Sequence, residues 1–462
     1  MSQGPGVANF LASKGDSILI RQKVGAWWIG VAIVATLLIG GTAWWMAHQT
    51  LEPTNDGEIA VLVSRSNSTT WPRLVQSFST EARRNGWIVS EAETEHPGRL
   101  RIVFSDGGAV LFRLYKELGH AGLRQRVLAL CDQPRPPIAI LSGSNSGSAR
   151  VVAQALQERD RPGRPVPVFL LTSGTVDDLT AIHPDKTFRF GHKNSRQAKE
   201  VVHRLSKLYE DQGSNPPSLR VAVVEIEDDS FACEFSKLVK KELIDTFGEP
   251  KQGDESRIKF ETLKLPTGIG TFDDPTEQER RIAAYLAREM SSVPAQAWVI
   301  VLPAAADVFR RFWLSQFEAL QEVGADRLAQ HFGNLTYIAG DSLDFSDFSI
   351  SLKPENLHAT AIFYAQYDPR RGGEAAPSPE LVREALYHEI GRTVLTVLTD
   401  RSARRAPESL QKAFAKYRRT KDGPTFFEDG ERRGGGGPVV VRSFPLESKE
   451  QKFLFDFPAE MK

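Results

Sequence analysis

Two hydrophobic patterns alternate along most of this chain. Short apolar runs that are typical of strands occur at residues 59–63, 100–104, 138–142, 166–171, 219–226, 260–265 and 298–302. Amphipathic stretches between them predict helices at residues 71–85, 111–130, 195–209, 231–247, 277–290 and 307–320. Because strands separated by helices of this length build parallel sheets covered on both faces, the pattern predicts an α/β fold.

The alternating region is too long for one sheet around a single core. Two sequential doubly wound lobes suit its length better, the first beginning at Ile59 and the second near Gly191. A cleft between two such lobes is the expected place for a ligand.

A long uninterrupted apolar segment stands ahead of this region. Residues 24–47 carry no charged side chain and are long enough, as a helix, to cross a hydrocarbon core of roughly 30 Å. Tryptophan pairs at positions 27–28 and 44–45 would lie about 25 Å apart on such a helix, at the two membrane interfaces. The segment therefore predicts a transmembrane helix, with a tail at residues 1–23 and a linker at residues 48–57.

The charges on either side of this segment orient it. The leader carries Lys14, Arg21 and Lys23 against one acid, whereas acidic residues follow the segment. The positive-inside rule then places the tail in the cytoplasm, which predicts a single-pass protein of the cytoplasmic (inner) membrane whose bulk is periplasmic or extracellular. A secretory signal cleaved near residues 41–43 is the alternative, although the long apolar run and long leader favour an uncleaved anchor.

Composition and motifs exclude several classes of function. Lysine plus arginine and aspartate plus glutamate number 58 each, so no charge excess argues for nucleic acid as a partner. No zinc-binding HExxH pattern and no GxSxG nucleophile turn occur, and His388–Glu389 lacks a second histidine. We therefore expect no enzyme activity, no metal and no cofactor. Cys131 and Cys233 are interpreted as buried thiols, with a disulfide as the alternative.

The most suggestive stretch for function is residues 138–175. Two apolar runs there each end in a loop of serine, glycine and threonine. A strand that ends in such a loop and leads into a helix presents backbone N–H groups and hydroxyls at one edge of a parallel sheet, where small polar or anionic ligands bind. Ordinary strand-to-helix turns that need small residues are the other interpretation.

The order of these features resembles the type 1 periplasmic binding protein fold, specifically the leucine/isoleucine/valine-binding-like branch of ABC transporter substrate-binding proteins. Residues 139–149 (AILSGSNSGSA) and 166–175 (VPVFLLTSGT) are similar to two strand-and-loop units of that family. Residues 187–191 (TFRFG) resemble its crossing into the second lobe. Residues 423–433 and 438–444 are similar to its closing segment, in which a turn, here Asp429–Gly430, joins two short strands.

The resemblance also implies how the chain is divided between the lobes. A strand at residues 361–368 and a helix at residues 381–398 would return the chain to the first lobe. The first lobe then comprises residues 58–188 and 343–422, and the second comprises residues 189–342 and 423–462.

Four site residues follow from the first two matches. Ser146 and Thr175 correspond to the positions that hold the carboxylate and amino groups of an amino-acid ligand in this family. The backbone around Gly147 and Ser173 would donate further hydrogen bonds.

Three further residues complete the predicted site. Phe231 replaces a tyrosine often found there and would cover the ligand, while Arg65 would reach into the cleft. Asp341 would pair with the ligand's amine, with a solvated turn or hinge residue as the alternative interpretation. The facing loop at residues 303–305 (PAA) lacks the family's usual aromatic, which weakens the case for an amino acid.

The sequence is compatible with two functions. One is a membrane-anchored extracytoplasmic solute-binding protein that closes its lobes around a small polar ligand, amino acid or amide-like, and delivers it to an ABC-type permease. The other is a sensing or protein-interaction ectodomain with a degraded cleft that acts through a separate membrane signalling partner.

Overall fold

The structure is a computed structural model that describes sixteen stretches of the chain, all within one compact unit, Thr54–Lys462. They are residues 57–64, 70–90, 98–117, 119–143, 145–211, 219–227, 229–248, 258–265, 275–292, 297–304, 306–322, 335–340, 360–367, 379–418, 426–432 and 439–442. No helix within these stretches is long and apolar enough to span a membrane. The predicted tail and transmembrane segment, residues 1–47, lie outside them.

The first half of the described chain builds a seven-stranded sheet in the order β2-β3-β4-β1-β5-β6-β7. Strands β4, β1, β5, β6 and β7 are parallel, whereas β2 and β3 run antiparallel at one edge. The bounds are β1 (Gly57–Ser64), β2 (Ile88–Val89), β3 (Arg99–Val103), β4 (Ala109–Glu117), β5 (Ala139–Ser142), β6 (Val168–Leu171) and β7 (Thr187–Arg189).

One predicted helix is wrong over its first part. We expected a helix across residues 111–130, but β4 occupies Ala109–Glu117 and the helix begins only at Gly119. The run at residues 109–115 is apolar except for Arg113, a pattern that does not separate a buried strand from a buried helix. The Asp106–Gly107 turn ahead of it, with Gly107 at a φ of 77°, closes a β3–β4 hairpin and is the signal that identifies the strand.

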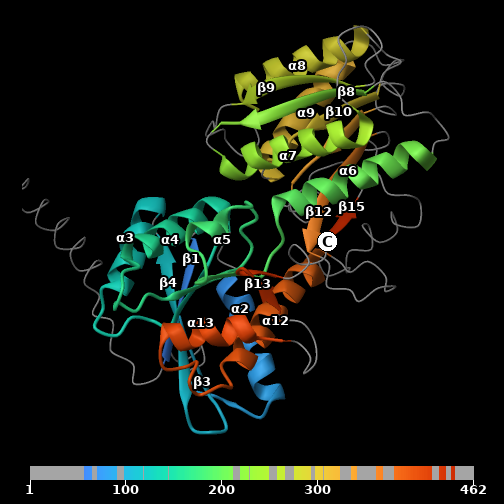
Figure 1. The fold of residues 1–462 in the computed structure, drawn as a ribbon. Coiled ribbons are helices and arrows are strands. Elements are labelled where there is room, and N and C mark those ends of the chain that lie inside the picture. Colours follow the sequence, from blue (N-terminus) through green and yellow to red (C-terminus); the bar gives the residue numbers. More distant parts are fainter. Residues whose placement is uncertain are drawn as a thin grey trace, which may run out of the picture. The chain divides into compact units, whose positions relative to one another are not determined.

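Helices from two distant parts of the sequence cover this sheet. They are α2 (Thr70–Arg84), α3 (Gly119–Cys131), α4 (Ser146–Arg159) and α5 (Leu179–Ile182), and later α12 (Pro379–Val397) and α13 (Pro407–Lys416). Helix α12 packs along α2, as Figure 1 shows. Side chains of α12 and α13, including Ile390, Val394 and Phe414, belong to the same buried core as β1 and β5.

The second sheet has six strands in the order β15-β12-β11-β10-β8-β9 and is parallel except for β15. Its strands are β8 (Leu219–Ile226), β9 (Ile258–Leu265), β10 (Ala297–Val301), β11 (Leu335–Ile338), β12 (Thr360–Tyr367) and β15 (Val439–Arg442). The helices of this part are α6 (Asn194–Asp211), α7 (Ser230–Phe247), α8 (Glu277–Ser292) and α9 (Ala306–Glu322). Two parallel-sheet lobes of α/β type are thus present.

The strand pairing differs from the expected division of the chain in two places. Strand β12 lies within residues 343–422, which were expected in the first lobe, but it pairs in the second sheet. The short hairpin of β13 (Phe427–Glu428) and β14 (Glu431–Arg432) was expected in the second lobe, yet Phe427 packs in the core of the first. Strand β12 therefore belongs to the second sheet, whereas the β13–β14 hairpin forms a separate two-stranded sheet that packs on the core of the first lobe.

Local sequence signals explain where several helices begin. Asp229 caps α7, and its carboxylate accepts hydrogen bonds from the N–H groups of Phe231 and Ala232. Helix α8 begins with a reciprocal capping box, in which Thr276 and Glu279 each accept the other's backbone N–H.

Both cysteines are free thiols, so the disulfide alternative is wrong. Cys131 is buried, whereas Cys233 is only half-buried and donates to the carbonyl of Ile226 at 3.4 Å. Burial raises the pKa of Cys131 to about 12, which keeps its thiol protonated and unreactive at neutral pH.

Candidate functional site

The candidate site is built on the carboxyl edge of the first sheet. Strands β5 and β6 pair in parallel with Ser142 opposite Leu171, so the loops that follow them leave the sheet side by side. Backbone bonds continue the pairing beyond the strands, from Thr172 N–H to the Ser142 carbonyl and from Ser173 N–H to the Gly143 carbonyl. The two serine- and glycine-containing loops predicted from the sequence are therefore adjacent.

Ser146 joins these two loops. Its hydroxyl oxygen accepts the N–H of Thr175 at 3.1 Å and the N–H of Val176 at 3.3 Å, and the residue is only 5% exposed. Ser146 stands in the first turn of α4, whose cap is Asn145. The structure thus brings Ser146 and Thr175 together, but the hydroxyl of Ser146 binds the protein's own backbone.

Arg189 holds the loop after β6 in place through hydrogen bonds to its backbone. The residue is 0% exposed, and its guanidinium donates to three successive carbonyls, those of Thr175, Val176 and Asp177, at 3.2, 2.6 and 3.3 Å. Burial lowers the pKa of Arg189, and the neighbouring Glu431 opposes this shift. A buried cation here costs desolvation energy that only a full set of acceptors offsets, which the three carbonyls supply.

The C-terminal hairpin delivers the carboxylate that faces this arginine. Glu431 lies 3.4 Å from Nε of Arg189 and 3.5 Å from Nζ of Lys193, and accepts a hydrogen bond from Thr180 at 2.6 Å. The predicted Asp429–Gly430 turn is confirmed, with φ angles of 49° and 73°. Gly430 is required there because a Cβ would lie 2.1 Å from the carbonyl oxygen of Thr187.

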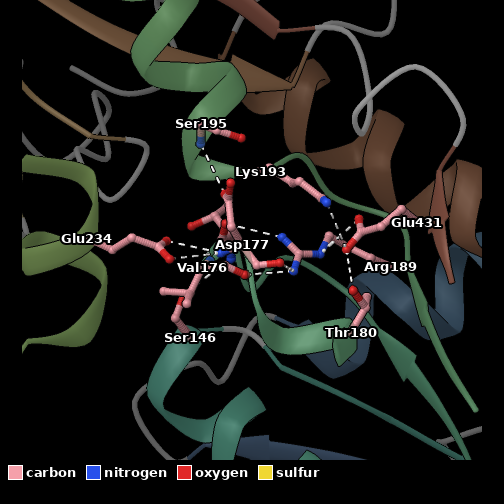
Figure 2. Close-up of polar contacts among 10 residues, drawn as sticks. Ser146, Val176, Asp177, Thr180, Arg189, Lys193, Ser195, Glu234 and Glu431 are labelled. Atoms are coloured by element: carbon pink, nitrogen blue, oxygen red, sulfur yellow. Dashed lines mark hydrogen bonds and ion pairs between the residues drawn. The ribbon is translucent and has the colours of Figure 1, made fainter. Parts of the chain in front are cut away.

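On the opposite side of the loop, Glu234 reaches it from helix α7 (Figure 2). Its carboxylate accepts the N–H of Asp177, with the nearer oxygen at 3.0 Å, and the side-chain amide of Asn194 at 2.7 Å. Burial raises the pKa of Glu234, and the carboxylates of Asp177 and Asp178 raise it further, while the two hydrogen bonds lower it.

The loop also fixes the start of helix α6. The carboxylate of Asp177 accepts the N–H of Ser195 at 3.1 Å, and the carbonyl of Thr175 accepts the N–H of Asn194 at 2.8 Å. These contacts satisfy donors of the first turn of α6 that have no partner within the helix. The loop after β6 is therefore tied directly to β5, β7, α6 and α7, and through Arg189 to the C-terminal hairpin.

The remaining predicted residues lie in different surroundings. Gly147 follows Ser146 in α4, and a Cβ there would lie 3.2 Å from the His120 ring. Ser173 donates its hydroxyl to the Gly143 carbonyl at 3.4 Å. Phe231 is buried, with its ring stacked on Phe235 at 5.7 Å and so close to Gly340 that a Cβ there would lie 2.3 Å from it.

Parts of the predicted site cannot be placed. Arg65 and Asp341 lie outside the described residues, as does Ala305. In the facing loop, Pro303 and Ala304 are both buried, and Ala304 donates its N–H to the Leu302 carbonyl at 2.9 Å.

Sequence reasoning missed three residues that organise this site. Arg189 lies inside the TFRFG motif, where a lone arginine in an apolar strand signals a buried cation with specific acceptors. Glu431 directly follows the Asp429–Gly430 turn, but its partner is far away in sequence. Glu234 lies between the buried Phe231 and Phe235, and an acid on such a helix face is the signal that could have identified it.

Comparisons with known proteins bear on the fold. No protein-family model and no curated protein matches the sequence. Solved structures do match. A leucine-binding protein from Thermotoga maritima is 14% identical with a TM-score of 0.54, and the match covers 83% of this chain and 94% of that one.

Two other solved structures give similar figures. A substrate-binding protein of an ABC transporter from Desulfitobacterium hafniense, in complex with leucine, is 13% identical with a TM-score of 0.52, over 85% of this chain and 98% of that one. A solute-binding protein from Rhodopseudomonas palustris, in complex with 3,4-dihydroxybenzoic acid, is 11% identical with a TM-score of 0.51, over 84% and 92%. The chain therefore has the type 1 periplasmic binding protein fold, the fold of branched-chain amino acid substrate-binding proteins.

Proposed function

We propose that this chain is an extracytoplasmic solute-binding protein that closes its two lobes around a small polar ligand, amino acid or amide-like, for an ABC-type transporter. The observation that carries the proposal is the convergence at the carboxyl edge of the first sheet. There the loop after β6 meets groups from both lobes, including Ser146 of α4, Asn194 of α6 and Glu234 of α7. Ligands of open α/β sheets bind beyond the carboxyl ends of the strands, at such an edge.

The fold supports the same proposal. The similar structures bind leucine in one case and an aromatic acid in another, so the fold serves small solutes of different chemistry. Fold alone does not fix function, which is why the proposal depends on the site.

We further propose that residues 24–47 anchor the protein in the cytoplasmic membrane with the tail at residues 1–23 inside. The uncharged run and its flanking tryptophan pairs support an anchor. Fractionation of cells that express the full chain tests it: the protein should stay in the membrane fraction with its N-terminus intact. Release of a soluble form that lacks about the first 45 residues would show a cleaved signal instead.

One observation favours a second function, an ectodomain for sensing or protein interaction. The N–H groups of Thr175, Val176 and Asp177 already donate to side chains of the protein itself. A loop whose donors are used internally can serve as a rigid part of a protein-binding surface without any small ligand.

A ligand screen decides between the two functions. The full chain, kept in mild detergent, is heated with a panel of amino acids, amino-acid amides and aromatic acids. A ligand present at a hundred times its Kd stabilises the folded state by about 2.7 kcal/mol, so at least one panel member should raise the Tm in a concentration-dependent way. A Tm that no member shifts would contradict the solute-binding function.

A further inference from the structure

The loop after β6 has its backbone donors already occupied at the point where a ligand's anionic group would need them. Three successive N–H groups, at Thr175, Val176 and Asp177, point to side-chain oxygens of the protein. Two of these groups donate to the hydroxyl of Ser146, and the third donates to the carboxylate of Glu234. Glu234 therefore already occupies the Asp177 N–H that a bound carboxylate would need.

The charges around this loop point the same way. The carboxylates of Asp177 and Asp178 flank Glu234, and Asp178 is paired with Arg150 at 2.7 Å. The guanidinium of Arg189 is engaged by three carbonyls and faces Glu431, and Lys193 lies beside the same Glu431. A ligand carboxylate at this loop would therefore be repelled by the nearby carboxylates. The described cations, Arg150, Arg189 and Lys193, each already have a partner in the protein.

Acceptor atoms, by contrast, are in excess. Asn194 is 0% exposed and donates its amide N–H to Glu234, but its side-chain carbonyl oxygen has no hydrogen-bond partner among the described residues. A buried acceptor without a partner costs free energy, and a ligand N–H or O–H would remove that cost. The carboxylate of Glu234 has lone pairs for a second donor in the same place.

We propose that Glu234 is the specificity-determining residue of this edge, where it excludes ligands that present a free carboxylate and favours ligands that present an amide, hydroxyl or ammonium donor. This inference rests on the proposed solute-binding function and names its ligand class. The ligand's donor would be received by Glu234 and by the carbonyl oxygen of Asn194. Ser146 keeps its place as the link between the two loops.

Matched ligand pairs test this assignment. The full chain is titrated with carboxylic acids and with the corresponding primary amides, for example 4-methylpentanoate and 4-methylpentanamide, which carry no ammonium group and differ only at the carboxyl group. The wild-type protein should bind the amides about tenfold or more tightly than the acids, because one charge-assisted hydrogen bond forms with the amide and cannot form with the acid. In Glu234→Gln, a neutral variant of the same size, this preference should fall by about tenfold because acids bind better and amides worse.

The control is Asp245→Asn, which removes one exposed charge from the same helix and should keep the wild-type preference. Thermal unfolding curves of both variants establish that each is folded. Acids that bind the wild type as tightly as amides, or a Glu234→Gln preference equal to that of the wild type, would overturn the assignment while leaving the solute-binding function intact. Binding of neither panel by the wild type or by Glu234→Gln would instead reject the solute-binding function, and this assignment with it.

Discussion

Two buried arginine–glutamate pairs, one in each lobe, use the same chemistry for different purposes. Arg311 of α9 is 3% exposed and directs its guanidinium at Glu279 of α8, 2% exposed, through hydrogen bonds of 3.3 and 3.1 Å. Arg189 is equally buried but donates to three backbone carbonyls, and it meets Glu431 only in a longer ion pair of 3.4 Å.

The two arginines therefore have different structural roles: Arg311 joins two helices, whereas Arg189 fixes the path of a loop. The Arg311–Glu279 pair joins two helices that cover the second sheet, and its glutamate also belongs to the capping box of α8. Arg189 instead sets the path of a loop at the edge where ligands bind in this type of sheet. Burial of a charged pair is therefore a poor indicator of a ligand site. The type of acceptor is more informative, because the arginine at the candidate site donates to loop carbonyls rather than mainly to a carboxylate.

The largest expected effect comes from removing either arginine. We expect Arg189→Met and Arg311→Met each to lower the free energy of unfolding by about 3–5 kcal/mol, because one removes a buried cation from three carbonyls and the other removes the buried cation that neutralises Glu279. Denaturant unfolding of the two variants measures this loss. A change below about 1 kcal/mol at either position would contradict the pairing described here.

A second substitution in each variant distinguishes the helix-joining role of Arg311 from the loop-fixing role of Arg189. Glu279→Gln added to Arg311→Met should restore most of the stability, because it removes the unpaired charge and keeps the capping box. Glu431→Gln added to Arg189→Met should restore little, because the three carbonyls still lose the hydrogen bonds that the guanidinium donates. Equal recovery in both double variants would remove the distinction between the two pairs.

A smaller effect is expected at Ser146. Ser146→Ala removes the acceptor of two backbone N–H groups and should cost about 1–3 kcal/mol of unfolding free energy. Ser291→Ala is the control, since that exposed hydroxyl bonds only within its own helix, and should change stability by less than about 0.5 kcal/mol. Equal effects of the two substitutions would show that Ser146 does not hold the loop.

The smallest effect is a pH dependence at Glu234. Burial raises the pKa of Glu234 in the folded chain, so the folded state holds this proton more tightly than the unfolded state does. The stabilisation is complete below the ordinary glutamate range and is lost as the pH rises through the raised pKa. The stability of the wild type relative to Glu234→Gln should therefore increase as the pH falls from neutral into that window, and a flat difference would contradict the raised pKa.

The fold was largely predictable from periodicity and local signals. Strand β8 was predicted at its observed bounds, and α7 differs from its prediction by one residue at Ser230. The β3–β4 hairpin was missed because a nearly continuous apolar run does not reveal its own backbone conformation. The placement of β12 was missed because strand order depends on contacts across the whole chain.

The site was predictable only in part, for a related reason. The approach of Ser146 to Thr175 followed from two parallel strands that end at one edge. The partners of Arg189 did not, because Glu431 lies far along the sequence in a hairpin whose docking depends on the core of the first lobe. The acid on a buried helix face indicates that Glu234 has a partner, but the partner itself, a loop of the other lobe, is not encoded by any local pattern.

Hydrogen exchange at single amides tests most directly whether the protein's own side chains hold the loop after β6. In the ligand-free wild type, the amides of Thr175, Val176 and Asp177 should be protected. Ser146→Ala should selectively deprotect the first two, and Glu234→Ala should selectively deprotect Asp177. Exchange of all three amides at the rate of an unstructured peptide in the wild type would contradict the account.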